Sequence, residues 1–185
     1  KAEALSPQSE TVVAGNLVVD NADASAPEIP RGFAGGGIVL GGGSRNTVLR
    51  NRVTGNATFG IFVLSLNDFL PTNNRVEGNV LERNGIDLGY APTGAPDAGG
   101  NCFAGNSFIS SLPDNIESVM ACDVASTLTK VPTLGDISSP PGPDYRDVPA
   151  PGPQPVQPPA EQLSIGGAGM LSLTVDLAGI QVPSA

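Results

Sequence analysis

Acidic side chains are the first candidates for chemistry in this sequence. Asp68, Asp87 and Asp97 follow one another through the middle of the chain, and Arg45 and Arg75 are basic residues in the same region. Calcium takes several oxygen ligands in one place, and carboxylates supply them. The acids are therefore candidate ligand-binding residues, with the two arginines as basic partners. No cofactor is expected, and calcium is the one metal ion that these acidic residues could bind. The acids could equally be ordinary solvated loop residues.

Two aromatic residues lie beside these acids. Phe69 follows Asp68, and Tyr90 lies between Asp87 and Asp97. Aromatic side chains offer a flat face with a polar or apolar rim, on which a sugar ring can stack. Both are therefore candidate carbohydrate contacts, and the alternative for both is packing against the body of the fold.

Cys102 and Cys122 make up the whole cysteine content, and the chain has no His. Structural zinc sites are built from Cys and His, so no metal site is predicted for the pair. A disulfide is the preferred interpretation, and two buried free thiols are the alternative. Disulfides persist in oxidising compartments, so we expect a secreted or cell-surface protein.

The formal net charge is −9, and the nine Lys and Arg residues are scattered. A nucleic-acid interface needs a basic stripe that faces the phosphates, so nucleic acid is not an expected partner. The acidic balance also disfavours anionic membranes. No apolar run is long enough to span a bilayer.

An internal repeat organises residues 11–122. Three copies of the pattern Asn-x-apolar-x-x-Asn-x-apolar begin at Asn46, Asn74 and Asn101, and a degenerate copy begins at Thr11. Self-similarity at such a period indicates stacked structural units. The aligned copies give two apolar columns, which are Val13, Val48, Val76 and Phe103, and Val18, Val53, Leu81 and Phe108.

Asn fills two further columns of the alignment. The middle column is Asn16, Asn51, Asn79 and Asn106, and the last column is Asn21, Asn56 and Asn84, with Ser111 in the fourth copy. Asn tolerates the left-handed conformation that a corner requires, and stacked Asn amides can bond to one another. The columns predict structural Asn ladders, and a polar binding strip is the alternative.

A second apolar segment follows each copy, at residues 37–40, 60–63 and 85–88, with a weaker fourth around Ile116. Each of the first three begins with Gly-Ile and alternates its apolar side chains, as a half-buried strand does. Asn at every fifth position argues against a helical repeat, because Asn competes with the helical backbone.

The pattern Asn-x-Val-x-x-Asn-x-Val-x-x-Asn, followed by Gly-Ile-x-Leu, resembles the right-handed parallel β-helix repeat family of the pectin-lyase-like superfamily. The resemblance covers residues 11–122 and implies an all-β fold of about four coils. Coils of this kind stack at the spacing of hydrogen-bonded strands, about 4.8 Å. Members include polysaccharide lyases, glycoside hydrolases, phage tailspikes and non-catalytic surface proteins, so the resemblance implies no single function.

The catalytic motifs of that family are a further criterion. The polygalacturonase pattern of Asn-Thr-Asp, Asp-Asp, Gly-His-Gly and Arg-Ile-Lys is absent from this sequence, which argues against that activity. Pectate lyase-like chemistry uses calcium-binding acids with an Arg or Lys as base. The resemblance implies that stacked coils would bring the loops of Asp68 and Asp97 to one edge, with Asp87, Arg45 and Arg75 nearby.

The composition changes after Cys122. Residues 132–160 are rich in Pro and predict an extended linker. Residues 171–177 alternate Leu and Val with polar residues, as an amphipathic strand does. We therefore divide the chain into an N-terminal extension at 1–10, a β-helix domain at 11–131, a Pro-rich linker at 132–160 and a C-terminal strand segment at 161–185.

The ends of the stack give an expectation about partners. Residues 1–10 are polar and make a poor cap, so we expect the chain to be part of a longer β-helix or to have its first coil covered by another chain. The segment at 161–185 could add to a neighbour's sheet and form a homo-oligomer, or it could fold back on its own coils.

Three functions follow from these patterns. The first is a non-catalytic extracellular module that binds glycan or another cell-surface component, which the missing catalytic motifs favour. The second is a polysaccharide lyase or glycoside hydrolase, or a fragment of one. The third is a structural or assembly protein that docks by its C-terminal arm.

Overall fold

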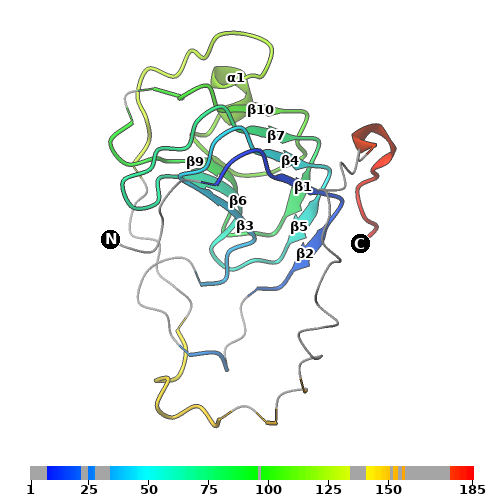
Figure 1. The fold of residues 1–185 in the computed structure, drawn as a ribbon, viewed down its shortest axis with the longest axis vertical. Coiled ribbons are helices and arrows are strands. Elements are labelled where there is room, and N and C mark those ends of the chain that lie inside the picture. Colours follow the sequence, from blue (N-terminus) through cyan, green and yellow to red (C-terminus); the bar gives the residue numbers. More distant parts are fainter. Residues whose placement is uncertain are drawn as a thin grey trace, which may run out of the picture.

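The computed structural model describes residues 8–21, 25–27, 34–95, 97–133, 141–150, 152–153, 156 and 176–185. Short strands form three parallel sheets, which are the faces of one stack of coils (Figure 1). The chain passes from sheet to sheet and then returns to the first one a coil higher. The predicted parallel β-helix is confirmed.

The first three coils each contribute one strand to each sheet, and the fourth coil contributes strands to the first and third sheets. The first sheet is β1 (Val12–Ala14), β4 (Thr47–Leu49), β7 (Arg75–Glu77) and β10 (Cys102–Ala104). The second sheet is β2 (Leu17–Val19), β5 (Arg52–Thr54) and β8 (Val80–Glu82). The third sheet is β3 (Ile38–Gly41), β6 (Phe59–Leu64), β9 (Ile86–Tyr90) and β11 (Ser111–Leu112).

The register of the first two sheets follows the predicted apolar columns. In the first sheet Val48 lies between Val13 and Val76, and Phe103 follows Val76. In the second sheet Val53 lies between Val18 and Leu81. Like side chains therefore stack on like, and the middle residue of each three-residue strand points into the stack.

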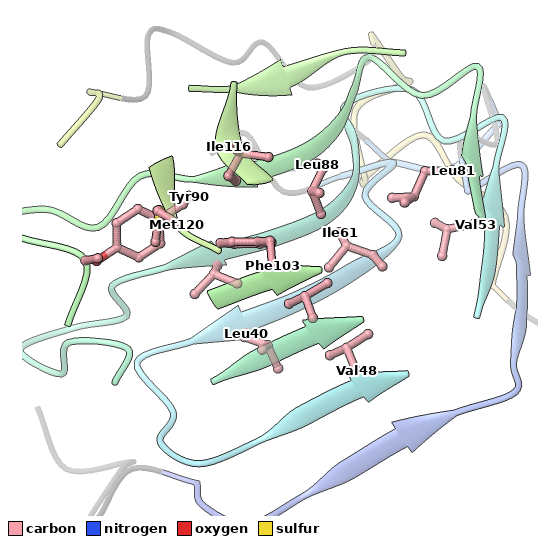
Figure 2. Packing of buried hydrophobic residues seen from close by; sticks show 13 residues of the cluster. Leu40, Val48, Val53, Ile61, Leu81, Leu88, Tyr90, Phe103, Ile116 and Met120 are labelled. Atoms are coloured by element: carbon pink, nitrogen blue, oxygen red, sulfur yellow. The ribbon is translucent and has the colours of Figure 1, made fainter. Parts of the chain in front are cut away.

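The interior of the stack is filled by these columns (Figure 2). Val48, Val53, Val76, Ile61 and Leu81 are all fully buried, as predicted. Burial of one such aliphatic side chain contributes about 1.5–3 kcal/mol. With few aromatic residues, the stability must come from many aliphatic side chains repeated in register.

The predicted alignment of the third sheet is confirmed between β3 and β6, where Ile38 pairs with Ile61, and is wrong by two residues between β6 and β9. Ile61 pairs with Leu88 and not with Ile86, which pairs with Phe59. Ile86 is therefore only half-buried, in a second apolar cluster around Phe59 and Phe62. The shift places Tyr90 opposite Val63, inside the stack (Figure 2).

Three Asn ladders hold the coils together, one more than predicted. The predicted middle ladder is Asn16, Asn51, Asn79 and Asn106, and the predicted last ladder is Asn21, Asn56 and Asn84. A further ladder joins Asn46, Asn74 and Asn101 at the start of each copy. The alternative of a polar binding strip does not hold for Asn51 and Asn79, because both are fully buried.

Each ladder has a direction. The backbone N–H and the side-chain Nδ2 of Asn51 both donate to Oδ1 of Asn79, at 2.8 and 2.9 Å. Nδ2 of Asn51 also donates to the carbonyl of Val13 in the coil before, at 2.9 Å. One amide therefore bonds to both neighbouring coils, and the last Asn of each ladder needs an acceptor of another kind, which for Asn101 is the carbonyl of Ala98.

The left-handed residue at each corner is the one before the ladder Asn, and not the ladder Asn itself. At the corner between the first and second sheets these residues are Gly15, Arg50, Gly78 and Gly105, all with φ between 51° and 67°. The expectation that the ladder Asn takes this conformation is therefore wrong. Its side chain must instead lie along the stack, where it reaches both neighbouring coils.

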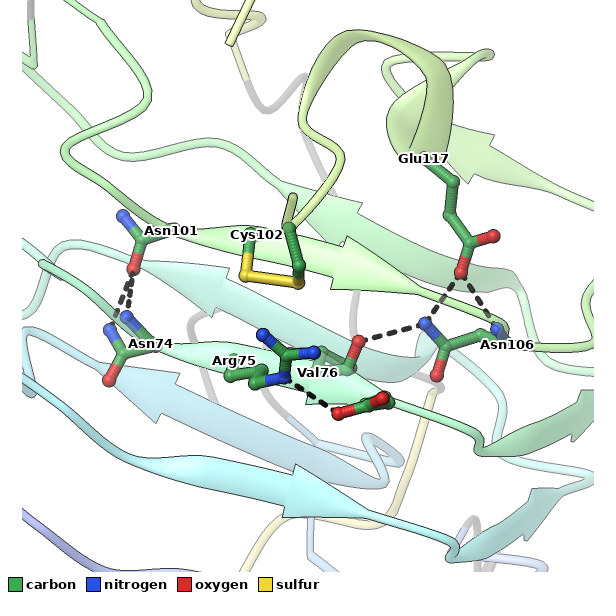
Figure 3. The surroundings of a disulfide bond; sticks show 9 residues. Asn74, Arg75, Val76, Asn101, Cys102, Asn106 and Glu117 are labelled. Atoms are coloured by element: carbon green, nitrogen blue, oxygen red, sulfur yellow. Dashed lines mark hydrogen bonds and ion pairs between the residues drawn. A yellow bond between two sulfur atoms is a disulfide. The ribbon is translucent and has the colours of Figure 1, made fainter. Parts of the chain in front are cut away.

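Carboxylates end two of the ladders. Oε1 of Glu117 accepts from the backbone N–H and Nδ2 of Asn106, at 2.8 and 2.7 Å (Figure 3). Oδ1 of Asp87 accepts the same pair of bonds from Asn84. Asp87, and not the predicted Ser111, therefore ends the last ladder, because Ser111 pairs with Leu88 in the third sheet.

The last coil is covered by a short helix, α1 (Ile116–Val119), and the residues that follow it. Ile116 belongs to this helix and not to the predicted fourth strand, and it is fully buried together with Met120. Ala121 pairs with Phe103 at the edge of β10. The predicted disulfide joins Cys102 to Cys122 on this edge (Figure 3), with 4.7 Å between the two Cα atoms.

The C-terminal residues fold back on the coils. The proposed strand at 171–177 lies outside the described residues except at its end, where Leu177 begins a 3₁₀ helix, η1 (Leu177–Gly179). The strand assignment is therefore wrong at Leu177.

In the Pro-rich linker, Asp144 to Asp147 form a turn closed by a backbone hydrogen bond of 2.9 Å.

Substitution of Leu81 by Ala tests the core register. Leu81 is fully buried, and removing buried methyl groups leaves a cavity that typically costs about 2–5 kcal/mol. Urea unfolding of L81A should show this loss. The matched control is V80A, since Val80 is only half-buried on the same strand. Equal stability of L81A and wild type would contradict the register.

Substitution of Glu117 tests the ladder ends. In E117A the N–H and Nδ2 of Asn106 lose their acceptor, and an unsatisfied donor costs about 1–3 kcal/mol. E117Q retains an acceptor oxygen and should lose less. The control is E82A, since Glu82 is exposed on the second sheet. A stability of E117A equal to that of E82A would show that the ladder needs no terminal acceptor.

Candidate functional site

The outer face of the first sheet carries polar side chains in register. Because the middle residue of each strand points inward, its two neighbours point outward. Thr47, Arg75 and Cys102 form one outward row. Leu49, Glu77 and Ala104 form the row beside it. The charged residues Arg75 and Glu77 therefore lie on the central strand β7. Arg75 lies between Thr47 and Cys102 in one row, and Glu77 lies between Leu49 and Ala104 in the other.

Arg75 and Glu77 bond to each other across this face (Figure 3). Nε of Arg75 lies 2.6 Å from Oε2 of Glu77, and both side chains are about two-fifths exposed. The hydrogen bond from Arg75 is the main cause that lowers the pKa of Glu77, and the same bond raises the pKa of Arg75. Glu77 is therefore an ionised acceptor beside a charged donor.

A hollow of about 300 Å³ lies next to this pair. It is lined by residues from the first sheet and from the corner that follows it, which are Leu49, Arg50, Glu77, Gly78, Ala104 and Gly105. We call it the sheet hollow. Small residues form much of it, since Gly78 and Gly105 have no side chain and Ala104 has one methyl group.

Arg50 lies at the corner side of the sheet hollow. A Cβ placed at Gly78 would lie 3.5 Å from Cγ of Arg50, so the arginine side chain extends over this glycine. Its Nη1 donates to the carbonyls of Leu177, Ala178 and Ile180 in the C-terminal segment. Arg50 thus contacts the hollow and the C-terminal segment at once.

Two predicted ligand residues lie in a loop at the end of β6. Leu66 and Phe69 close a tight turn through two backbone hydrogen bonds, and Asp68 is exposed on it. Phe69 is half-buried, and its Cβ lies near Gly42. Arg45, the predicted basic partner, bonds instead to Glu10 at 2.8 Å. Arg45 and Arg75 thus bond to different acids.

Asp97 lies at a second hollow of about 380 Å³, lined by Asp97, Ala98, Gly99, Gly100, Ser126 and Leu128. The Oδ1 atom of Asp97 accepts a hydrogen bond from the backbone N–H of Gly99 at 2.7 Å, so the carboxylate is bonded within its own loop. This hollow is built from loops, whereas the sheet hollow is built on paired strands. It is therefore a weaker candidate than the sheet hollow.

Tyr90 and Asp87 are both buried, so neither side chain faces a ligand at the surface in this structure. Tyr90 is fully buried in the core, and its hydroxyl donates to the carbonyl of Asp97 at 2.8 Å. Burial raises the pKa of Tyr90 to about 12. Asp87 is also buried, and its Oδ2 atom accepts from the N–H groups of Ile109 and Ser110.

The predicted acids do not form a metal site within the part of the chain that the structure describes. No group of three or more His, Cys, Asp or Glu side chains there is placed to hold a metal ion. Asp87 bonds to the end of a ladder. Asp68 and Asp97 are exposed in two loops that stack at one edge, as predicted, and hydrogen bonds such as Asn73 N–H to the carbonyl of Gly99 join these loops. The structure thus places Asp87 in surroundings different from those of the other two acids.

Sequence analysis missed Glu77 and Arg50. The signal for Glu77 was the segment Arg75-Val-Glu77, in which an inward Val separates two outward charges of opposite sign. Arg50 could have been found as the one corner residue with a long side chain among Gly15, Gly78 and Gly105. Both residues can be recognised in the sequence once the column of inward-pointing side chains has been identified.

The comparison with known families agrees with this architecture. The family described as Right handed beta helix region matches residues 4–118. The chain belongs to this family. The match spans the coils and most of helix α1, and it ends before the disulfide partner Cys122. Neither a curated protein nor a solved structure matches the chain.

Two findings bear on the location of this β-helix protein. Among the described residues, no helix is long and apolar enough to cross a membrane. The Cys102–Cys122 disulfide is consistent with a compartment other than the reducing cytoplasm.

Titration of Glu77 tests the electrostatics of the site. The pKa of Glu77 is lowered from 4.5, so its contribution to stability is present above that pH and is lost as the pH falls through the lowered value. Carboxyl chemical shifts followed by NMR should give a midpoint below 4.5, and R75Q should raise it. An unchanged midpoint in R75Q would mean that the ion pair does not form in solution.

Proposed function

We propose that this protein is a non-catalytic extracellular module that binds a polysaccharide, or another hydroxyl-rich component of a cell surface, in the sheet hollow. The observation that carries the proposal is the hollow itself, which lies on a flat strand face beside a fixed donor and acceptor pair. The β-helix fold, which occurs in carbohydrate-active and carbohydrate-binding proteins, supports it.

The chemistry of the hollow suits a sugar. A sugar hydroxyl both donates and accepts hydrogen bonds, and its ring carries C–H groups. Glu77 can only accept, and the guanidinium groups of Arg75 and Arg50 can only donate. Leu49 and Ala104 offer apolar contact between them. A few fixed polar groups within an otherwise apolar or small-residue surface are typical of ligand sites.

The rigidity of the site also supports binding. Arg75 and Glu77 lie on β7, which is bonded to strands on both sides. Arg50 lies at a corner held by the middle Asn ladder, since Asn51 follows it directly. Groups that are held in place before a ligand arrives need little ordering on binding, which favours affinity.

Catalysis is less well supported by the same residues. Most glycosidases use a pair of carboxyl groups, one of which must keep its proton to act as an acid. Of the residues that line the sheet hollow, Glu77 alone is acidic, and Arg75 favours its ionised form. This arrangement suits an acceptor for a hydroxyl better than it suits a proton donor.

The predicted location completes the proposal. A disulfide holds the edge of the last coil, and such bonds persist outside the reducing cytoplasm. A secreted or surface-attached protein would meet polysaccharides there.

An oligosaccharide array, run beside an assay for unsaturated sugar products, tests the proposal. We expect binding without turnover. Replacement of Glu77 by Ala removes a charged acceptor, worth about 1.5–3 kcal/mol, so E77A should bind at least about tenfold more weakly. The matched control is E82A, an exposed acid on the neighbouring sheet.

Three outcomes separate the alternatives. Equal binding by E77A and wild type would place the ligand elsewhere. Release of unsaturated products would favour a lyase. A blank array for wild type and for a variant with the C-terminal segment released, described below, would reject the proposal.

A further inference from the structure

The C-terminal segment is held on the coils mainly by two arginines. We call residues 177–183 the strap. Nη1 of Arg50 donates to three strap carbonyls, those of Leu177, Ala178 and Ile180, at 2.8–2.9 Å. Nε of Arg52 donates to the carbonyl of Pro183 at 2.7 Å. Main-chain oxygens thus provide all of these contacts.

One apolar contact fixes the position of the strap. Ile180 is half-buried, and a Cβ added at Gly15 would lie 2.9 Å from its Cγ2 atom. The methyl group therefore fits only because the corner residue of the first coil is glycine. Gly15 also has a φ of +67°, which favours glycine on its own account.

The strap carbonyls that bond to the two arginines bring no negative charge to them. A carbonyl oxygen accepts a hydrogen bond but carries no net charge, whereas a charged acceptor gives a stronger bond to a guanidinium. Arg50 is also a lining residue of the sheet hollow. A ligand in the hollow and the strap therefore compete for the same guanidinium group.

We propose that the strap is an autoinhibitory element, which must release Arg50 before the sheet hollow can bind its ligand fully. This inference rests on the proposed function, because it concerns the regulation of the same hollow. The strap is joined to the last coil through residues 132–176, which include the Pro-rich linker at 132–160. A linker of this length keeps a released segment close to its site. Release is thus reversible, and the strap returns when the ligand leaves.

The test uses the full chain with one substitution in the strap. Ile180→Gly removes the methyl contact with Gly15, adds no charge beside the arginines and leaves every residue of the hollow intact. The control is Gln181→Gly, which loosens the backbone equally one residue later, at an exposed side chain. Both variants keep the coils unchanged, so their unfolding transitions should match that of wild type.

Release of the strap is measured without any sugar. Phenylglyoxal reacts with accessible arginine side chains, and peptide mapping by mass spectrometry reports each arginine separately. Arg50 should react about tenfold faster in I180G, as expected if the strap is open for about a tenth of the time in wild type. Arg146, which is exposed in the linker, should react equally in all proteins.

Binding is then measured on the oligosaccharide array. I180G should bind about tenfold more tightly than wild type and Q181G, and I180G/R50Q should lose this gain. Equal reactivity of Arg50 in I180G and wild type would show that the strap shields nothing. Faster reaction of Arg50 with unchanged sugar affinity would overturn the inhibition and leave glycan binding intact. A blank array for both proteins, with Arg50 released, would reject the glycan-binding function and its regulation together.

Discussion

The structure depends on one constraint, which is that every buried ladder Asn must find an acceptor for its backbone N–H and its side-chain amide, either in the next coil or in a group that ends its ladder. Asn79 donates twice to Asn106 and reaches back to the carbonyl of Val48. A buried amide without partners is costly, so the ladder fixes the spacing and the register of the coils together. It also requires a terminal acceptor, which Glu117 and Asp87 provide for two of the ladders.

The ladders fix which residues reach the surface. The Val between two ladder positions must point inward, so Arg75 and Glu77 must point outward from β7. The left-handed residue before each ladder Asn lies at an outer corner, which leaves Arg50 free to extend over Gly78. The sheet hollow is therefore a direct consequence of the packing inside the stack.

The sequence predicted the parts of the fold that repeat. The columns of Val13 and Val18 and two Asn ladders followed from spacing, and the disulfide followed from the presence of two Cys residues without any His. The third sheet was misaligned because Gly85-Ile86 repeats the local pattern of Gly60-Ile61, while the coil places Leu88 beside Ile61. The site was missed for a related reason. Asp87 and Tyr90 resembled ligand residues, but their surroundings come from other coils, which spacing along one coil does not reveal.

Amide hydrogen exchange of Asn51, Asn79 and Asn106 tests the role of the ladders most directly. Each of these backbone N–H groups donates to a side-chain oxygen across the stack, and not to a strand partner. If the ladders hold the coils together, these amides should exchange only through global unfolding, as slowly as the amides of Val53 and Leu81. Exchange as fast as that of the exposed turn residue Asn67 would show that strand pairing alone holds the coils.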